Sequence, residues 1–170
     1  MDSYLERLQQ AIASATHGMT PDELMRHAEG KWCAAEILEH LYLTYAGTQK
    51  AFERCLKAGK PLAGVPTFNQ RVAAAAVTGF GYFPGGRKSP DQVLPRGMSV
   101  EKVVADIGPQ IAAMDKLITQ CEERYGSRTK ILDHPVLGPL TARQWRRFHL
   151  AHGRHHVRQI LQRRPAAAPR

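Results

Sequence analysis

The chain has 170 residues, 43% of them hydrophobic and 23% charged, with 24 lysines and arginines against 15 acids and a formal net charge of +9. This composition is typical of one globular domain and excludes a wholly disordered chain, and no apolar run is long enough to span a membrane. The N-terminus shows no secretory signal, and three scattered cysteines (Cys33, Cys55 and Cys121) argue against a disulfide framework. A reducing, cytoplasmic location is therefore expected.

The excess of positive charge raises the question of a nucleic-acid partner. The sequence contains no zinc finger, no glycine-rich RNA-binding signature and no platform of alternating basic and aromatic residues. We therefore interpret the charge as a basic, solvated surface, which could also steer an anionic substrate. Nucleic-acid binding remains the least favoured of the functions considered.

Helical periodicity marks the first third of the chain. Residues 3–16 place apolar side chains at helical spacing. Thr20 and Pro21 form a helix-start signal for a short segment that ends at Gly30. The longest helix is expected over residues 31–58, where apolar residues cover most of the circumference. Such a helix should lie centrally in a bundle.

Residues 59–98 interrupt this pattern with many prolines and glycines, so a loop-rich insertion is expected there. One run within it, residues 69–78, is compatible with a helix. A stretch of this length is usually a lid, a binding loop or a partner contact. Its aromatic residues are expected to tie the segment down or, alternatively, to form a pocket wall. These aromatic residues are Phe68, Phe80, Tyr82 and Phe83.

Two more helices are expected in the last third. Ser99 caps a helix that runs to about Tyr125, and Pro109 within it should kink the helix or delay its start. Residues 133–140 read as a rigid, proline-containing connector without a useful strand pattern. Thr141 then opens a helix that ends near residue 163.

The pattern predicts an all-α fold, a four-helix bundle with a long irregular crossover between the second and third long helices. A single domain should span residues 1–162, followed by a disordered tail over residues 163–170.

The last helix carries an unusual concentration of histidines. With about 100° of rotation per residue, His149, His152 and His156 share one side of the helix with Trp145. Trp145 marks that side as the one facing the core, and His155 lies at its border. A buried imidazole needs a partner, and histidines at i and i+4 can bind one metal ion.

A third metal ligand would have to come from another helix. His40 is the best candidate, because it lies within the most apolar helix. Glu36 and Glu39 could orient a ligand, although ion pairs on the bundle surface are the favoured interpretation of both. His17 and His27 read as surface residues. His134, before a proline, reads as a structural hydrogen-bonding residue that could reach the rim of a pocket.

Two segments together resemble a known family. The run WCAAEILEHL, which ends just after His40, is similar to the second-helix signature of the DinB-like superfamily, and HGRHHVRQI, from His152, is similar to its last-helix signature. The connector DHPVLGPLT and Trp145 resemble a branch of uncharacterised DinB-like domains with a His-Pro-x-x-Gly-x-Leu-Thr connector. The resemblance covers roughly residues 3–162.

The resemblance implies a DinB-type four-helix bundle, often a homodimer, with a divalent metal ion held by His40, His152 and His156. Nickel or zinc would be the expected metal. Characterised relatives include thiol-dependent S-transferases and isomerases that use small cytoplasmic thiols. This chain departs from the family pattern by its long aromatic loop and by the additional His149 beside the metal pair.

Three imidazoles leave a coordination position open on a metal ion, which is typical of catalytic sites. We therefore expect a metal-dependent transferase or hydrolase-like enzyme that acts on a small electrophile, with a small thiol as a candidate co-substrate. The alternative is a metal-stabilised binding or scaffold protein without turnover. That alternative predicts four protein ligands, with His149 or His155 completing the set.

Overall fold

The computed structural model describes residues 1–82 and 89–164. Its elements in chain order are α1 (Ser3–Thr16), α2 (Pro21–Met25), α3 (Ala34–Ala58), α4 (Phe68–Ala74), a π-helical turn (Ala75–Gly79), a 3-10 turn (Asp91–Val93), α5 (Val100–Tyr125), β1 (Leu132–His134), β2 (Gly138–Leu140) and α6 (Ala142–Leu161).

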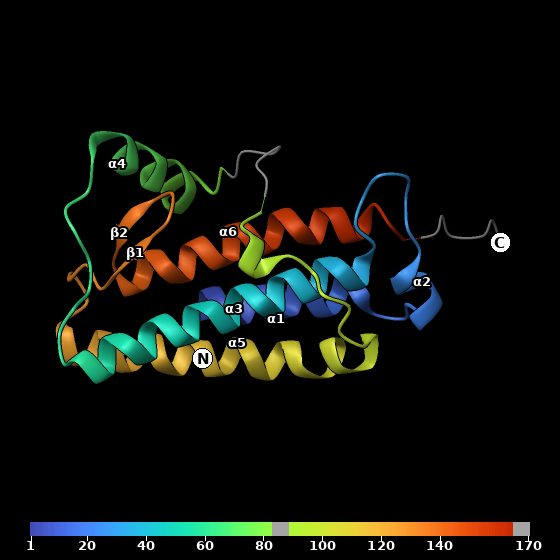
Figure 1. Cartoon of the computed structure of the whole chain (residues 1–170), viewed down its shortest axis with the longest axis horizontal. Coiled ribbons are helices and arrows are strands. Elements are labelled where there is room, and N and C mark those ends of the chain that lie inside the picture. The colour runs from blue at the N-terminus through green and yellow to red at the C-terminus, as the bar shows by residue number, and fades with distance from the viewer. Residues whose placement is uncertain (83–88, 165–170) are drawn as a thin grey trace.

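Four long helices, α1, α3, α5 and α6, form the body of the molecule (Figure 1). The most extensive packing joins α3 to α5 and α1 to α6. Helices α3 and α5 run parallel, because Glu39 near the start of α3 contacts Met98 just before α5, whereas Cys55 near the end of α3 contacts Tyr125 at the end of α5. The predicted all-α four-helix bundle is confirmed.

The parallel arrangement explains the long crossover. Helix α3 has 25 residues and is therefore about 37 Å long, and the chain must return over that length before α5 can begin. The returning segment pairs with the connector before α6, where the Leu62 amide donates to the Ile131 carbonyl at 2.9 Å. It then forms α4, capped by Thr67, and the 3-10 turn follows at Asp91–Val93.

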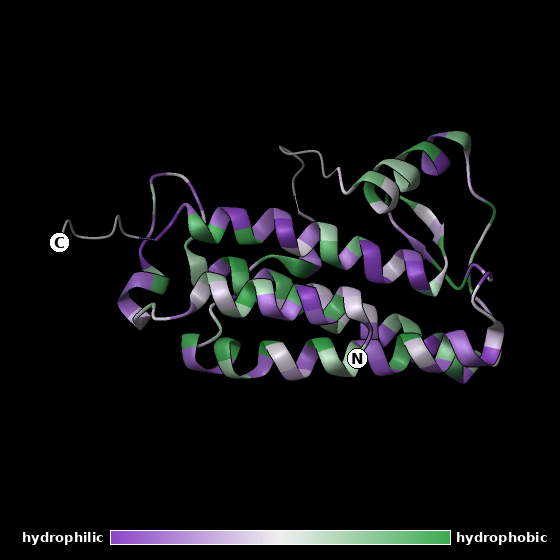
Figure 2. Cartoon of the chain, turned by 180° about the vertical axis from the view of Figure 1, so that it is seen from behind, coloured by the Kyte–Doolittle hydropathy of each residue, from purple (hydrophilic) through white to green (hydrophobic). Residues whose placement is uncertain are grey.

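The core lies between the four long helices. In Figure 2 each of them carries hydrophobic bands that alternate with hydrophilic ones, as an amphipathic helix should. Leu8 of α1, Phe52 of α3 and Met114 of α5 are fully buried. Gly153 of α6 packs directly against Leu8, and a Cβ at this position would overlap the Leu8 side chain. This glycine therefore sets the close approach of α1 to α6.

The described aromatic residues of the crossover do not hold it against the bundle, contrary to the expectation from the sequence. Phe68, Phe80 and Tyr82 are between 65% and 88% exposed, so the prediction that aromatic residues tie the segment down or line a pocket is wrong for these three. Phe83 lies outside the described residues. Backbone hydrogen bonds and caps hold the segment instead. The predicted helical run is confirmed as α4 with its π-helical continuation, whose Gly79 carbonyl accepts from Arg147 at 3.0 Å.

The connector before α6 contains a short hairpin that the sequence did not predict. Strands β1 and β2 are antiparallel, with Leu132 opposite Leu140. Each strand has only three residues, too few for an alternating pattern to be detected. His134 accepts hydrogen bonds from the amides of Val136 and Leu137 through Nδ1 at 3.1 and 3.2 Å, which confirms its structural role.

Helix boundaries depart from the sequence prediction in three places. Helix α5 begins at Val100 and continues through Pro109, so the predicted delay of its start is wrong. Helix α3 begins at Ala34, three residues later than expected, because the Cys33 amide is capped by the Glu36 carboxylate. Helix α2 ends at Met25, well before Gly30.

The predicted tail begins with two residues that contact the bundle. Arg163 donates to the Trp32 carbonyl at 3.1 Å, and Arg164 donates to the His17 carbonyl at 2.8 Å. Residues 165–170 lie outside the described part of the chain. Among the residues that the structure describes, no helix has the length and apolar character needed to cross a bilayer.

Candidate metal centre

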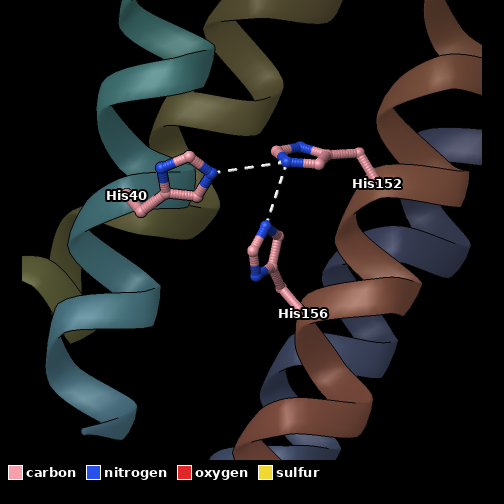
Figure 3. Close-up of side chains that lie close together, drawn as sticks. All are labelled: His40, His152 and His156. Atoms are coloured by element: carbon pink, nitrogen blue, oxygen red, sulfur yellow. Dashed lines mark hydrogen bonds between the residues drawn. The ribbon is translucent and has the colours of Figure 1, made fainter. Parts of the chain in front are cut away.

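Helices α3 and α6 bring His40, His152 and His156 together inside the bundle (Figure 3). All three side chains are buried, with exposed fractions between 3% and 7%. The Nε2 atom of His152 lies 3.3 Å from Nε2 of His40 and 3.0 Å from Nε2 of His156. The predicted candidate set therefore converges on one point from two helices distant in sequence.

These separations fit a metal centre. Nitrogen ligands about 2.0–2.1 Å from a tetrahedral zinc ion lie roughly 3.4 Å from one another. The three histidine nitrogens lie within 4.8 Å of one another. His152 and His156 are one turn apart on α6, so a single helix face supplies two ligands and α3 supplies the third.

Hydrogen bonds on the outer side of the rings set the tautomers of two of these histidines. Nδ1 of His40 donates to the Val93 carbonyl at 2.9 Å, and Nδ1 of His156 donates to Oε1 of Gln159 at 2.8 Å. A neutral imidazole with its proton on Nδ1 has a lone pair on Nε2. Both rings are therefore oriented so that Nε2 can bind a metal ion. Carbonyl and amide oxygens orient ligating histidines in this way in many metal sites.

The three inward-facing nitrogens do not satisfy one another. His40 and His156 present lone pairs, and Nε2 of His152 can carry only one proton. It can donate to one of its two neighbours at a time, which leaves lone pairs facing each other in a buried space. A cation at the centre converts this repulsion into attraction, so the donor set fits a bound metal ion.

Burial also sets the charge of the site. It lowers the pKa of His40, lowers the pKa of His156 to about 3, and lowers that of His152 well below its ordinary value. The mutual repulsion of the imidazolium forms contributes in the same direction. All three side chains are therefore neutral near pH 7, and the neutral imidazole is the form that binds a metal ion.

Aromatic rings surround the three histidines. The Trp32 ring lies 5.4 Å from the His40 ring, and the Phe148 ring stacks on His152 at 5.5 Å. His155 packs edge-on against His156 and accepts a hydrogen bond from Nε2 of Gln159 at 3.2 Å. These walls limit water access and lower the local dielectric, which strengthens electrostatic interactions within the site.

Glu39 has a role that the sequence did not reveal. Its side chain is buried, and its two oxygens accept from the amides of Arg96, Gly97 and Met98 at 2.7, 3.1 and 3.1 Å. The favoured interpretation as a surface ion pair is therefore wrong for Glu39. The carboxylate anchors the segment that carries Val93, whose carbonyl orients His40.

Glu36 points elsewhere. Its carboxylate accepts from the Cys33 amide at 2.8 Å and lies 3.5 Å from Nδ1 of the exposed His27. This contact agrees with the expectation of an ion pair at the surface, and Glu36 has no part in the three-histidine group.

His149 and Trp145, the other sequence candidates on α6, lie deeper in the core. His149 is completely buried, with its ring beside those of Tyr45 and Trp145, and burial lowers its pKa to about 3. Neither His149 nor His155 belongs to the group of converging ligands. Within the described residues, the ring nitrogens of His149, the Tyr45 hydroxyl and Trp145 Nε1 have no hydrogen-bond partner.

Comparison with known proteins bears on the fold and the site together. The family model for the DinB superfamily matches residues 4–160, a span that includes all three converging histidines. No curated protein and no solved structure matches the chain.

Proposed function

This chain belongs to the DinB superfamily, and we propose that it is a metal-dependent enzyme in which His40, His152 and His156 hold a divalent cation. The observation that carries the proposal is the convergence of three neutral Nε2 atoms, two of them fixed as acceptors by Val93 and Gln159. Nickel and zinc both suit an all-imidazole donor set.

The proposed reaction is transfer to, or hydrolysis of, a small electrophile. When bound, a divalent cation with three imidazole ligands and an open position favours the deprotonated form of a water molecule or thiol and polarises an electrophilic oxygen. A small cytoplasmic thiol is the proposed co-substrate, because a thiolate is a strong nucleophile at neutral pH.

The residues of the chain contribute orientation and exclusion of water. Val93 and Gln159 hold His40 and His156 in the required tautomer. Trp32 and Phe148 flank the site with apolar surface, against which a small electrophile can be positioned. Neither ring carries a charge that would compete with the substrate for the cation.

A metal-stabilised protein without turnover is the second candidate. The low exposure of the three imidazoles favours it, because a structural metal site is commonly closed to solvent. In that case the metal should raise stability but leave no exchangeable coordination position.

The test combines metal content with turnover. Wild type should bind nickel or zinc, and His152→Ala/His156→Ala should bind one equivalent fewer, whereas the exposed control His17→Ala should bind as much as wild type. Glutathione, bacillithiol and mycothiol would each be offered with an electrophilic aryl halide, with and without chelator. Unchanged metal content in the double variant would contradict the site, and metal binding without turnover in any thiol or hydrolysis assay would favour the scaffold.

A further inference from the structure

A second group of metal-ligating side chains lies outside the three-histidine site. We propose that His27, Cys33 and Glu36 bind a soft or borderline divalent cation such as Zn²⁺ at the start of α3. One ring nitrogen, the Cys33 sulfur and a carboxylate oxygen all lie within 4.8 Å of one another. Nδ1 of His27 is 3.5 Å from Oε2 of Glu36, close to the roughly 3.4 Å between ligands of a tetrahedral ion.

The local backbone brings these residues together. Helix α2 ends at Met25, and the chain then reverses through Gly30, which has a positive φ of 64°. The Lys31 amide closes this turn by donating to the Ala28 carbonyl at 3.0 Å. His27 at the beginning of the reversal is thereby placed beside Cys33 at its end.

The carboxylate is already oriented. Cys33 and Glu36 lie one helical turn apart, and the Cys33 amide donates to Oε2 of Glu36 at 2.8 Å. Metal-ligating carboxylates are commonly held by such hydrogen bonds. Cys33 is buried at 3% exposure, whereas the His27 side chain is 61% exposed, so the ion would lie between the bundle and solvent.

Space for a fourth ligand is present on the open side. A surface depression of about 430 Å³ is lined by residues 27–32 and by Glu36. Two of the three proposed ligands therefore face it, and a water molecule or a small donor can complete a tetrahedral set there. None of the three buried histidines lines this depression.

The ligand types select the metal. A thiolate, an imidazole and a carboxylate together suit Zn²⁺ better than Mg²⁺ or Ca²⁺, which prefer oxygen ligands. Cys33 loses its proton to solvent when it coordinates the ion. The three-histidine site contains no sulfur, so the two sites differ in spectroscopic signature.

The proposed site borders the first one through Trp32. This residue lies in the wall of the depression, its ring lies 5.4 Å from the His40 ring, and its carbonyl accepts from Arg163. A metal ion bound to His27 and Cys33 would fix both ends of the segment that carries Trp32.

Cobalt(II) titration of chelator-treated full-length protein tests the proposal. Cobalt replaces zinc in such sites, and coordination by a thiolate produces a sulfur-to-cobalt charge-transfer band. Wild type should show this band, and His152→Ala/His156→Ala should keep it while binding one equivalent fewer. Cys33→Ser and His27→Ala should lose the band and also bind one equivalent fewer than wild type.

The exposed position of His27 makes His27→Ala the decisive variant, because its fold should be unaffected. His17→Ala is the matched exposed control and should behave as wild type. A wild-type protein without the charge-transfer band, or a band that persists unchanged in both Cys33→Ser and His27→Ala, would overturn the proposal. These outcomes are independent of whether the three-histidine site turns over a substrate.

Discussion

Helix α6 contributes to two clusters of buried polar side chains that differ in how their groups are paired. In its first half, Arg146 donates to the carboxylates of Asp115 and Glu122 and to the hydroxyl of Thr119. In its second half, His152 and His156 meet His40, and like groups face each other. The first cluster pairs a cation with carboxylates, whereas the second brings together like groups that could hold a metal ion between them.

This difference separates a structural polar cluster from a functional one. Burial of a charged group is costly unless opposite charges and hydrogen bonds offset it, and the Arg146 cluster meets that condition. The facing imidazole nitrogens carry too few protons to satisfy one another, so the arrangement fits a bound cation. The comparison predicts that the first cluster determines stability and that the second determines metal binding.

The largest expected effect tests the structural cluster. Arg146→Met should lower the free energy of unfolding by about 3 to 5 kcal/mol, because it leaves Asp115 and Glu122 without their cation. The loss should be the same with and without added metal. Denaturant unfolding measures it.

His156→Ala is the counterpart in the second cluster. In metal-free protein its cost should be only about 1 kcal/mol. In a His27→Ala background, the stabilisation that added metal gives should vanish on the His156→Ala substitution. An equal cost for the two variants in chelator would contradict the distinction between the clusters.

The half-buried imidazole of His134, whose Nδ1 accepts two backbone hydrogen bonds, provides the next test. Burial lowers the pKa of His134 from 6.5 to about 4. The unfolded chain therefore binds this proton at higher pH than the folded chain, and stability falls as pH decreases from 6.5 to 4. The contribution should reach about 3 kcal/mol.

His134→Asn should reduce this pH dependence, because an amide oxygen can still accept from the Val136 and Leu137 amides but does not titrate in this range. Denaturant unfolding at several pH values, compared with wild type, measures the difference. Identical pH profiles for the two proteins would show that His134 is not the titrating group.

The smallest expected effect concerns Glu39, which is paired by the protein itself and also acts on the three-histidine site. Glu39 is satisfied by three backbone amides, yet the segment it anchors carries the Val93 carbonyl that orients His40. Glu39→Gln replaces one acceptor oxygen by a donor and should weaken metal binding at the three-histidine site by roughly tenfold. Nickel titration in a His27→Ala background isolates that site.

The exposed Glu101→Gln is the matched control and should bind nickel as the background protein does. If Glu39→Gln lowers stability but leaves nickel affinity unchanged, Glu39 acts only on the fold and has no positioning role.

Much of the fold could be predicted because it depends on local patterns. Cap signals at Thr20, Ser99 and Thr141 correctly placed three helix starts. The hairpin escaped prediction because Leu132–His134 and Gly138–Leu140 are too short to show a period. The prediction that aromatic residues tie down the crossover was wrong because the exposure of a side chain depends on what packs against its segment. A local sequence pattern does not contain that information.

The candidate site could likewise be predicted from the sequence only in part. Helical spacing placed His152 and His156 on one buried face, and His40 stood out as a histidine within the most apolar helix. The buried role of Glu39 could not be predicted, because its partners are backbone amides 57 to 59 residues away. Backbone donors are the same at every non-proline residue, so no sequence signal marks them.

The helices, their buried faces and the histidines on those faces follow from local sequence, because they depend on the rotation per residue and on side-chain polarity. The packing of the bundle places His40 against His152 and His156, brings the Val93 carbonyl to His40, and sets His27 beside Cys33 across a chain reversal. Such contacts depend on distances between segments that are far apart or turned back on themselves, and those distances are set by the packing of the whole bundle.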